Sequence, residues 1–209
     1  MKFGCAIEKM VACVVLVLAL VAGNAMAQIR VNQEGRGATA AKSILRLRQL
    51  TGYGPRAVMK SPDSGNSQRA GTREWVELGV QYDTEPDWID EVSLQYYALL
   101  RNRASPGDYI LIKGVVTYLD VARGRTHQGV AYIRPAALER FGDIVGVAVE
   151  AVVKGEVVSA LTEGRLSPQA PLPFEWWKNP RLAPKEGYIL DKSKTPFALI
   201  NFDEYEALK

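Results

Sequence analysis

The chain has 209 residues, 47% of them hydrophobic and 23% charged, with a formal net charge of +3. Its basic residues are scattered, and so mild a charge excludes a strongly basic nucleic-acid binder. The chain is long enough to bury a full hydrophobic core as one domain without disulfides or a structural metal.

The first 27 residues have the parts of a secretory signal peptide. Lys2 and Lys9 supply positive charge, Val11–Ala22 is an apolar run, and Ala25-Met26-Ala27 is a small-residue cleavage site. A transmembrane anchor is the alternative, but the run is shorter than the roughly 20 residues that span a bilayer. We therefore predict cleavage before Gln28, export to the periplasm, outer membrane or cell surface, and no transmembrane anchor in the mature chain.

Two other leader types fit less well. Met10–Cys13 resembles a lipoprotein attachment box, but Cys13 precedes most of the apolar run. Gly4 and Glu8 are one residue off the spacing of a type IV prepilin leader. Cleavage after residue 27 removes Cys5 and Cys13, the only two cysteines, so disulfides cannot stabilise the mature chain.

The mature chain is predicted to begin with a polar leader at 28–42 and to continue as one domain at 43–209. Ser43–Leu50 alternates leucine with arginine and favours a strand, with a short helix as the alternative. Composition makes Ser61–Gly71 an exposed loop.

Alternating hydrophobicity dominates the rest of the chain and predicts half-buried strands. They are expected at Arg73–Asp83, Glu91–Arg103, Tyr109–Ala122 (with Gly114 as a bulge or bend), Gly129–Arg134, Asp143–Leu161 (in two halves around Gly155), Gly187–Leu190 and Phe197–Phe202. One helix is expected at 135–141, with Pro135 in its first turn and Gly142 as its C-cap. This pattern predicts a mainly β protein, an antiparallel β-sandwich with one short helix.

Catalytic motifs are scarce in this sequence. His127, the single histidine, falls in a polar segment between two predicted strands, where a lone histidine is usually solvated. Without further His or Cys ligands, an ordinary zinc site is excluded, and so is a nucleophile triad unless His127 is its base. A carboxylate pair, as in glycosidases, is the remaining enzymatic option. We predict no catalytic residue, no metal site, no cofactor and no enzymatic activity.

The acidic segment between two predicted strands is a candidate calcium loop, because calcium prefers several carboxylate oxygens from one loop. Its carboxylates are Asp83, Glu85, Asp87, Asp90 and Glu91. The segment lacks the glycine and spacing of an EF-hand, so an acidic hairpin connection is the favoured interpretation.

Four tryptophans are candidate glycan contacts, because flat aromatic rings pack against sugar rings: Trp75, Trp88, Trp176 and Trp177. Core and rim packing is the favoured interpretation. The proline-bounded segment around Trp176-Trp177 is expected to be extended, so that one ring is buried while the other faces outward.

The segment WVELGVQYDTEPDWIDEVSLQYYALL at 75–100, with Tyr188–Leu190, Lys194–Ala198 and the acidic end at 203–206, resembles a family of exported pilus-like proteins of Verrucomicrobia. These proteins are encoded beside type IV pilus genes. The resemblance implies an immunoglobulin-like sandwich, similar to domains of archaeal type IV pilins. It also implies a role in pilus-like structures or adhesion, with pilus or envelope assembly proteins as partners and no catalytic residues.

One departure from true pilins bears on assembly. A pilin keeps its apolar helix, whereas here the cleavage site predicts its removal. Assembly would then use the sandwich itself, by edge-strand pairing between copies or through the leader. We therefore expect a non-enzymatic structural or assembly component of a type IV pilus-like system that contributes to adhesion, with a cell-surface glycan-binding module as the alternative.

Overall fold

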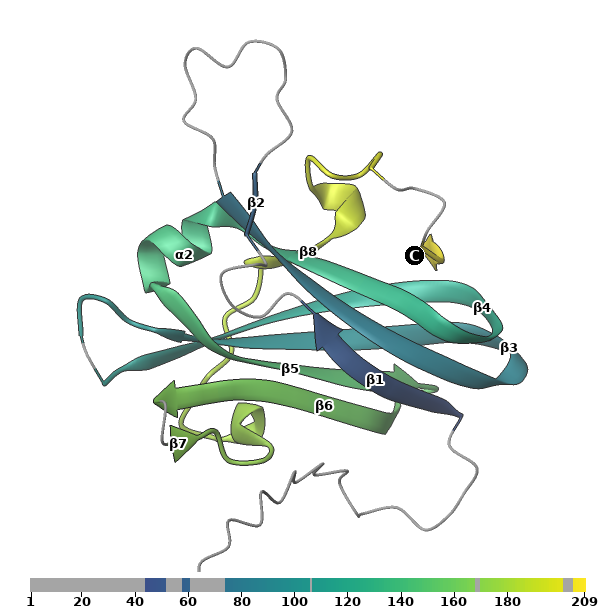
Figure 1. Ribbon diagram of the computed structural model, residues 1–209, viewed down its shortest axis with the longest axis horizontal. Coiled ribbons are helices and arrows are strands. Elements are labelled where there is room, and N and C mark those ends of the chain that lie inside the picture. The colour runs from purple at the N-terminus through teal and green to yellow at the C-terminus, as the bar shows by residue number, and fades with distance from the viewer. Residues whose placement is uncertain (1–43, 52–57, 61–73, 106, 168–169, 201–204) are drawn as a thin grey trace, which may run out of the picture. The chain divides into compact units, whose positions relative to one another are not determined.

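Two long antiparallel strands, β3 (Glu74–Arg101) and β4 (Tyr109–Ile133), form the frame of the domain (Figure 1). They pair along nearly their whole length, from Val76 with Ile133 to Arg101 with Tyr109. The computed structural model describes residues 44–51, 58–60, 74–105, 107–167, 170–200 and 205–209. The predictions for other residues lie outside this description: the signal peptide at 1–27 with Cys5 and Cys13, the leader at 28–42, and the loop Ser61–Gly71.

The β3–β4 ladder bends sharply in the middle. Its register shifts between Tyr82 and Thr84 and again between Thr84 and Trp88, and both strands turn back at one end of the domain (Figure 1). Alternate residues of both halves of β3, from Val76 in the first half to Leu100 in the second, belong to one buried cluster. The bent hairpin therefore encloses one core between two layers.

Shorter strands extend the two layers by antiparallel pairing. β1 (Leu45–Thr51) and β2 (Val58–Lys60) pair with the first half of β3, and β8 (Ile189–Asp191) pairs with the end of β4. In the other layer β5 (Asp143–Val153) pairs with the second half of β3, β6 (Glu156–Ser167) with β5, and β7 (Ala170–Pro171) with the end of β6. β9 (Ala207–Leu208) pairs with β4 at Tyr118 and Leu119.

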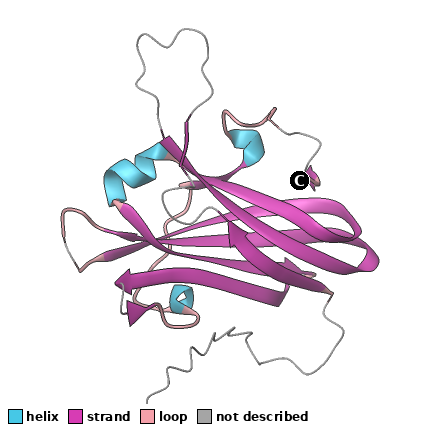
Figure 2. Cartoon of the chain, viewed as in Figure 1, coloured by secondary structure: helices cyan, strands magenta, loops and turns pink. Residues whose placement is uncertain are grey.

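Helices are a minor part of the described chain (Figure 2). α2 (Pro135–Phe141) begins with the predicted proline and ends at Gly142, whose φ of 101° and N–H bond to the Leu138 carbonyl make it the predicted C-cap. Two 3₁₀ turns are η2 (Trp176–Lys178) and η3 (Lys192–Lys194). No described helix is long and apolar enough to cross a membrane. The predicted antiparallel β-sandwich with one short helix is confirmed.

Several boundaries were predicted correctly. β1 is the strand expected at Ser43–Leu50, and the two halves expected around Gly155 are β5 and β6, although β6 runs on to Ser167, beyond the expected end at Leu161. They are joined at Lys154 and Gly155, which have φ of 52° and 83°. Two successive positive φ values are the signature of the hairpin turn that matches strand twist.

Other boundaries were wrong. The strands expected at Arg73–Asp83 and Glu91–Arg103 are the two halves of β3, and those at Tyr109–Ala122 and Gly129–Arg134 are parts of β4. The strand expected at Phe197–Phe202 is a turn over residues 197–200, with 201–202 outside the described residues.

Gly114 is neither a bulge nor a bend, because its pairing with Tyr96 is in register. A Cβ on Gly114 would lie 2.6 Å from the Cβ of Ile189, so this glycine instead admits the close approach of β8.

The outer faces of both layers are partly covered by the C-terminal third of the chain. Trp176 and Trp177 pack over Tyr97 and Ala148 on one layer, and Phe197 packs over Tyr132 on the other. The outer face of the second layer is less covered toward the bend. Among the described residues there, Val115 of β4, which pairs with β3, is 48% exposed, and Val157 of β6, which pairs with β5, is 52% exposed.

Candidate functional site

An open groove of about 480 Å³ lies where β3 bends, next to the β5–β6 turn. We call it the corner groove. Its lining comes from the bend (Pro86, Trp88, Ile89, Asp90, Glu91 and Ser93), from the end of β5 and its turn (Val152–Gly155), and from Ile44 at the start of β1. Three of the residues singled out in the sequence, Trp88, Asp90 and Glu91, therefore lie in one place.

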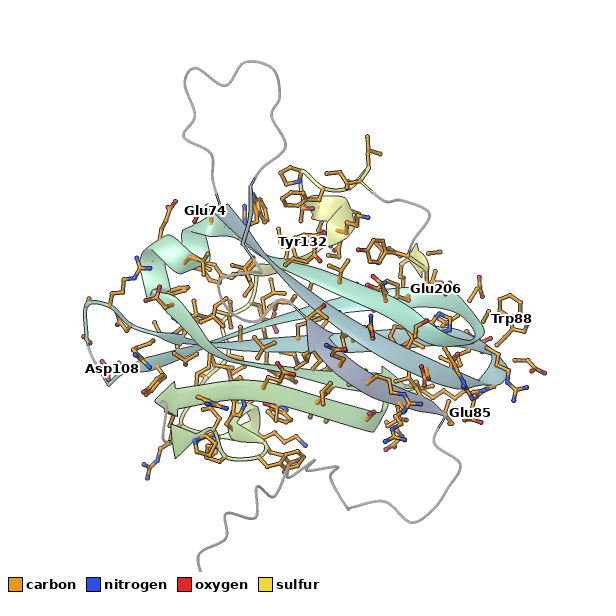
Figure 3. The ribbon with its side chains drawn as sticks, viewed as in Figure 1. Glu74, Glu85, Trp88, Asp108, Tyr132 and Glu206 are labelled. Atoms are coloured by element: carbon orange, nitrogen blue, oxygen red, sulfur yellow. The ribbon has the colours of Figure 1, made fainter. Side chains whose placement is uncertain are left out.

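Trp88 is the most exposed tryptophan of the chain, with 66% of its surface accessible. It projects from the end of the domain where β3 and β4 turn back (Figure 3). The next residue, Ile89, is buried at 5% exposure and joins the core, which fixes the backbone beneath the indole. Large exposed aromatic rings are favoured at binding surfaces, because one face can stay apolar while the N–H reaches water.

The acidic segment is not a hairpin connection, as the favoured interpretation had it, but the bend of a continuous strand. Three of its carboxylates contact cations of the same chain. Arg48 donates to Asp83 (2.6 Å), Arg123 lies 3.5 Å from Asp87, and Lys209 donates to Glu91 (2.6 Å). Glu85 and Asp90 are exposed. In the part of the chain that is described, no three His, Cys, Asp or Glu side chains are grouped to hold a metal ion.

Asp83 fastens β1 and β4 to the bend. It accepts hydrogen bonds from the Arg48 guanidinium of β1 and from the Thr126 backbone N–H of β4. Burial raises the pKa of Asp83, but the Thr126 N–H and the Arg48 guanidinium outweigh it, and the pKa lies below its usual value.

The structure does not bring the four tryptophans together. Trp75 makes an edge contact with Phe197, with ring centroids 6.0 Å apart, on the opposite layer from η2. Trp176 and Trp177 are adjacent and both buried, at 5% and 4% exposure. The prediction that one of these two faces outward was wrong. The segment forms a 3₁₀ turn instead of an extended chain, so successive side chains are not forced to opposite sides.

Both buried indoles have hydrogen-bond acceptors. Trp176 donates to Thr162 Oγ1 (2.8 Å), and Trp177 donates to Glu150 Oε1 (3.0 Å). Glu150 is itself 4% exposed and also accepts from the Tyr97 hydroxyl (3.2 Å), with Lys178 Nζ at 3.3 Å. This network anchors the covering segment to the outer face of β5.

The prediction that His127 lies in a solvated turn was wrong. The residue lies within β4, and its side chain is only 12% exposed. The ring stacks on Tyr82 at 5.2 Å between centroids. Its Nδ1 is 2.9 Å from Glu206 Oε1, and its Nε2 is 3.2 Å from Thr84 Oγ1. No sequence signal joins residues 79 positions apart, so this contact was missed.

The Thr84–His127–Glu206 chain has the residue types and the order of a nucleophile, a base and an orienting acid. The Thr84 hydroxyl donates to the Ala122 carbonyl (2.7 Å) and accepts from the Gly124 N–H (2.9 Å). Its contact with the imidazole is the third at this oxygen, and which atom donates depends on the tautomer of His127. Thr84 is also 5% exposed, which leaves little room for a substrate. The contacts fasten the segment before β9 to the bend.

A protein-family model matches residues 55–209, about three quarters of the chain. The chain belongs to this family. A crystal structure of a protein from Akkermansia muciniphila has the same fold, with a TM-score of 0.61 and 19% sequence identity. The match covers 79% of this chain and 92% of that one. No curated protein sequence matches the chain. The structural neighbour comes from a member of the Verrucomicrobia, the group that the sequence resemblance named, and at 19% identity it shows the fold alone.

Proposed function

We propose that this family member is a non-enzymatic structural component of a type IV pilus-like assembly in the bacterial envelope, and that it contributes to adhesion. Its immunoglobulin-like sandwich would join the assembly directly, because the predicted signal cleavage removes the apolar segment that a pilin uses. The observation that carries the proposal is the open edge of β6.

β6 is paired along only one of its edges over most of its length. β5 pairs with it from Glu156 to Gly164, while β7 reaches only Arg165 and Ser167. Within the described residues, no strand pairs with the outer edge over Glu156–Gly164. β1 comes close but does not continue the ladder, since Leu47 N–H donates to the Ser159 hydroxyl (3.1 Å) rather than to a carbonyl. Such an edge is a template for a strand from another subunit.

Charged side chains on β6 favour pairing with a specific partner strand over aggregation through the edge. Glu156 and Glu163 are exposed, and Glu163 pairs with Val147, whose side chain is in the core. A charge on the core-facing row of an edge strand is a common protection against aggregation. Desolvation already raises the pKa of Glu163, so a pairing strand must supply a partner for this carboxylate. We infer that the partner is a second copy or an envelope assembly protein with a complementary strand.

The test is site-specific cross-linking of a tagged copy in its own bacterium. Glu156→Cys and Glu163→Cys place exposed thiols on β6, and residues 28–209 contain no other cysteine. The matched control is Asp108→Cys, which is exposed in the β3–β4 connection at the end of the domain remote from the bend (Figure 3). We expect the β6 variants to be cross-linked to further copies and to pilus assembly proteins, identified by mass spectrometry. Equal cross-linking from Asp108→Cys, or monomer from all variants, would contradict the proposal.

A cell-surface glycan-binding module is the second candidate function, and the exposed ring of Trp88 favours it. Trp176 and Trp177 are buried and Trp75 packs on Phe197. A glycan function would therefore rest on one local site at the corner groove and not on a platform of four rings.

A further inference from the structure

We propose that the corner groove binds one or two rings of a neutral sugar, with Trp88 as the stacking platform and Asp90, Ser93 and Lys154 as hydrogen-bonding groups on its rim. This inference rests on the second candidate function and not on assembly through β6. It assigns a ligand class to a defined site, and its test leaves the β6 edge untouched.

The platform is a wide aromatic surface on a fixed backbone. Trp88 is 66% exposed and lines the groove, while Ile89 beside it is buried in the core. Trp88 also pairs with Ala122 in the β3–β4 ladder, so the indole is carried by a strand rather than by a free loop. A sugar ring has an apolar C–H face that matches an indole face, and its hydroxyls lie around the edge of the ring.

The rim supplies the donors and acceptors that hydroxyls need. Asp90 is an exposed acceptor, and Lys154 at the β5–β6 turn is an exposed donor. The Ser93 hydroxyl is positioned by Thr117 Oγ1 (3.0 Å), and a hydroxyl can both donate and accept. Polar groups of both kinds beside an apolar platform are typical of small-ligand sites, and about 480 Å³ is within their usual size.

The charge of the groove favours a neutral ligand. The groove is lined by two carboxylates, Asp90 and Glu91, and by one ammonium group, Lys154, and Lys209 donates to Glu91 (2.6 Å) from outside the lining. These four charges sum to zero. An anionic ligand would gain from Lys154 but would be repelled by Asp90, so charge complementarity selects against sialylated or sulfated sugars.

The test is calorimetric titration of the purified protein with lactose, N-acetyllactosamine and maltose, followed by intrinsic fluorescence. We expect saturable binding of at least one of these disaccharides, with a change in tryptophan emission. Trp88→Ala should weaken that binding by about tenfold or more, and Trp88→Tyr should keep most of it because a stacking ring remains. Asp90→Asn should weaken it less, since the amide can still accept a hydrogen bond.

The matched control is Phe174→Ala, which removes an aromatic ring of 43% exposure that lies outside the groove, against Trp177. It should leave sugar affinity within about twofold, which is below the loss expected for a stacking contact. Three results would overturn the proposal: no saturable binding at millimolar sugar, equal affinity for Trp88→Ala, or tighter binding of sialyllactose than of lactose. If sedimentation shows that Trp88→Ala instead dissociates an oligomer and no sugar binds, the occupant of the groove is a second copy.

Discussion

Two regions of this protein use tryptophan in opposite ways. At η2, the indoles of Trp176 and Trp177 are 5% and 4% exposed, and each N–H donates to a side chain of the sheet beneath. At the bend of β3, Trp88 is 66% exposed above a buried neighbour. The local sequences are alike, since the tryptophans of both regions lie near prolines and acidic residues.

The difference lies in what the sheet offers below each ring. Under η2 the strands present small residues and an acceptor, namely Ala148, Gly146 and the buried Glu150, so the rings can approach and be satisfied. At the bend, the strand itself turns and nothing described covers the indole. Buried rings stabilise the fold, whereas an exposed ring that gives the fold little stability is a candidate for binding. Substitutions in the two regions should therefore affect different properties.

The largest effect on stability is expected from Trp177→Ala. The change removes a buried ring that contacts Tyr97 and Trp176, and it leaves Glu150 without its indole donor. Large-to-small changes of this kind cost about 3–5 kcal/mol of unfolding free energy. The measurement is urea unfolding followed by circular dichroism. Trp177→Phe keeps a ring and loses only the donor, so it should cost about 1–3 kcal/mol. A loss below about 1 kcal/mol for Trp177→Ala would mean that the cover over β5 does not stabilise the fold.

The second largest effect on stability is expected from Gly164→Ala, where β6 lies close to β5 beneath the η2 segment. A Cβ on Gly164 would lie 2.5 Å from Gly146 Cα and 2.6 Å from the Val145 carbonyl oxygen, both rigid backbone atoms. Gly164→Ala should therefore lower the unfolding free energy by about 1–3 kcal/mol more than backbone strain alone.

Gly155→Ala provides the matched control for Gly164→Ala. Both glycines have a positive φ (146° and 83°), so both variants incur strain, but a Cβ on Gly155 meets nothing within 4 Å. Equal losses of unfolding free energy in the two variants, measured by the same urea titration, would show that the backbone around Gly164 can move to accept a Cβ.

The strand pattern of this protein was largely readable from its sequence, because alternation of apolar and polar residues survives in both halves of β3 and in β5. The continuity of β3 and β4 through the bend could not be predicted from the sequence. Asp83–Glu91, with Pro86 and five carboxylates, has the composition of a loop. The ladder with β4 nevertheless resumes at Trp88, because a bulge takes up the residues between Thr84 and Trp88. That error also misplaced His127, whose partners Thr84 and Glu206 are distant in sequence.

The candidate site was only partly predictable for the same reason. Trp88, Asp90 and Glu91 were singled out separately, for stacking and for calcium, and no sequence pattern connects them with Lys154 of another strand pair. Their meeting depends on the β5–β6 turn lying against the bend. Likewise, the burial of both Trp176 and Trp177 depends on a 3₁₀ turn that proline content alone does not predict.

A smaller, pH-dependent effect is expected where β1 meets the bend. The pKa of Asp83 is lowered in the folded state by the Thr126 N–H and Arg48, so its carboxylate stabilises the fold above about pH 4, the value in unfolded chains. This contribution is lost as the pH falls through the lowered folded-state pKa. Asp83→Asn should cost below about 1 kcal/mol at pH 7, because the Arg48 side chain is 47% exposed and solvent screens the pair.

The check on Asp83 is the difference in unfolding free energy between the protein and Asp83→Asn, measured from pH 7 to pH 2.5. We expect the difference to shrink as the pH falls below about 4. Arg48→Gln should add little in the Asp83→Asn background, because its partner is already neutral. A difference that stays constant with pH would assign the effect to shape rather than to charge.

The smallest effect on stability is expected from Trp88→Ala, and it makes the comparison with η2 most direct. An exposed side chain without a described packing partner should change the unfolding free energy by no more than about 0.5 kcal/mol. Urea unfolding of Trp88→Ala and Trp177→Ala in parallel measures both regions on one scale. If Trp88→Ala were as damaging as Trp177→Ala, the ring would be part of the packing of the bend and its exposure would say nothing about ligands. If it is neutral for folding, any loss of binding in the same variant belongs to the indole itself.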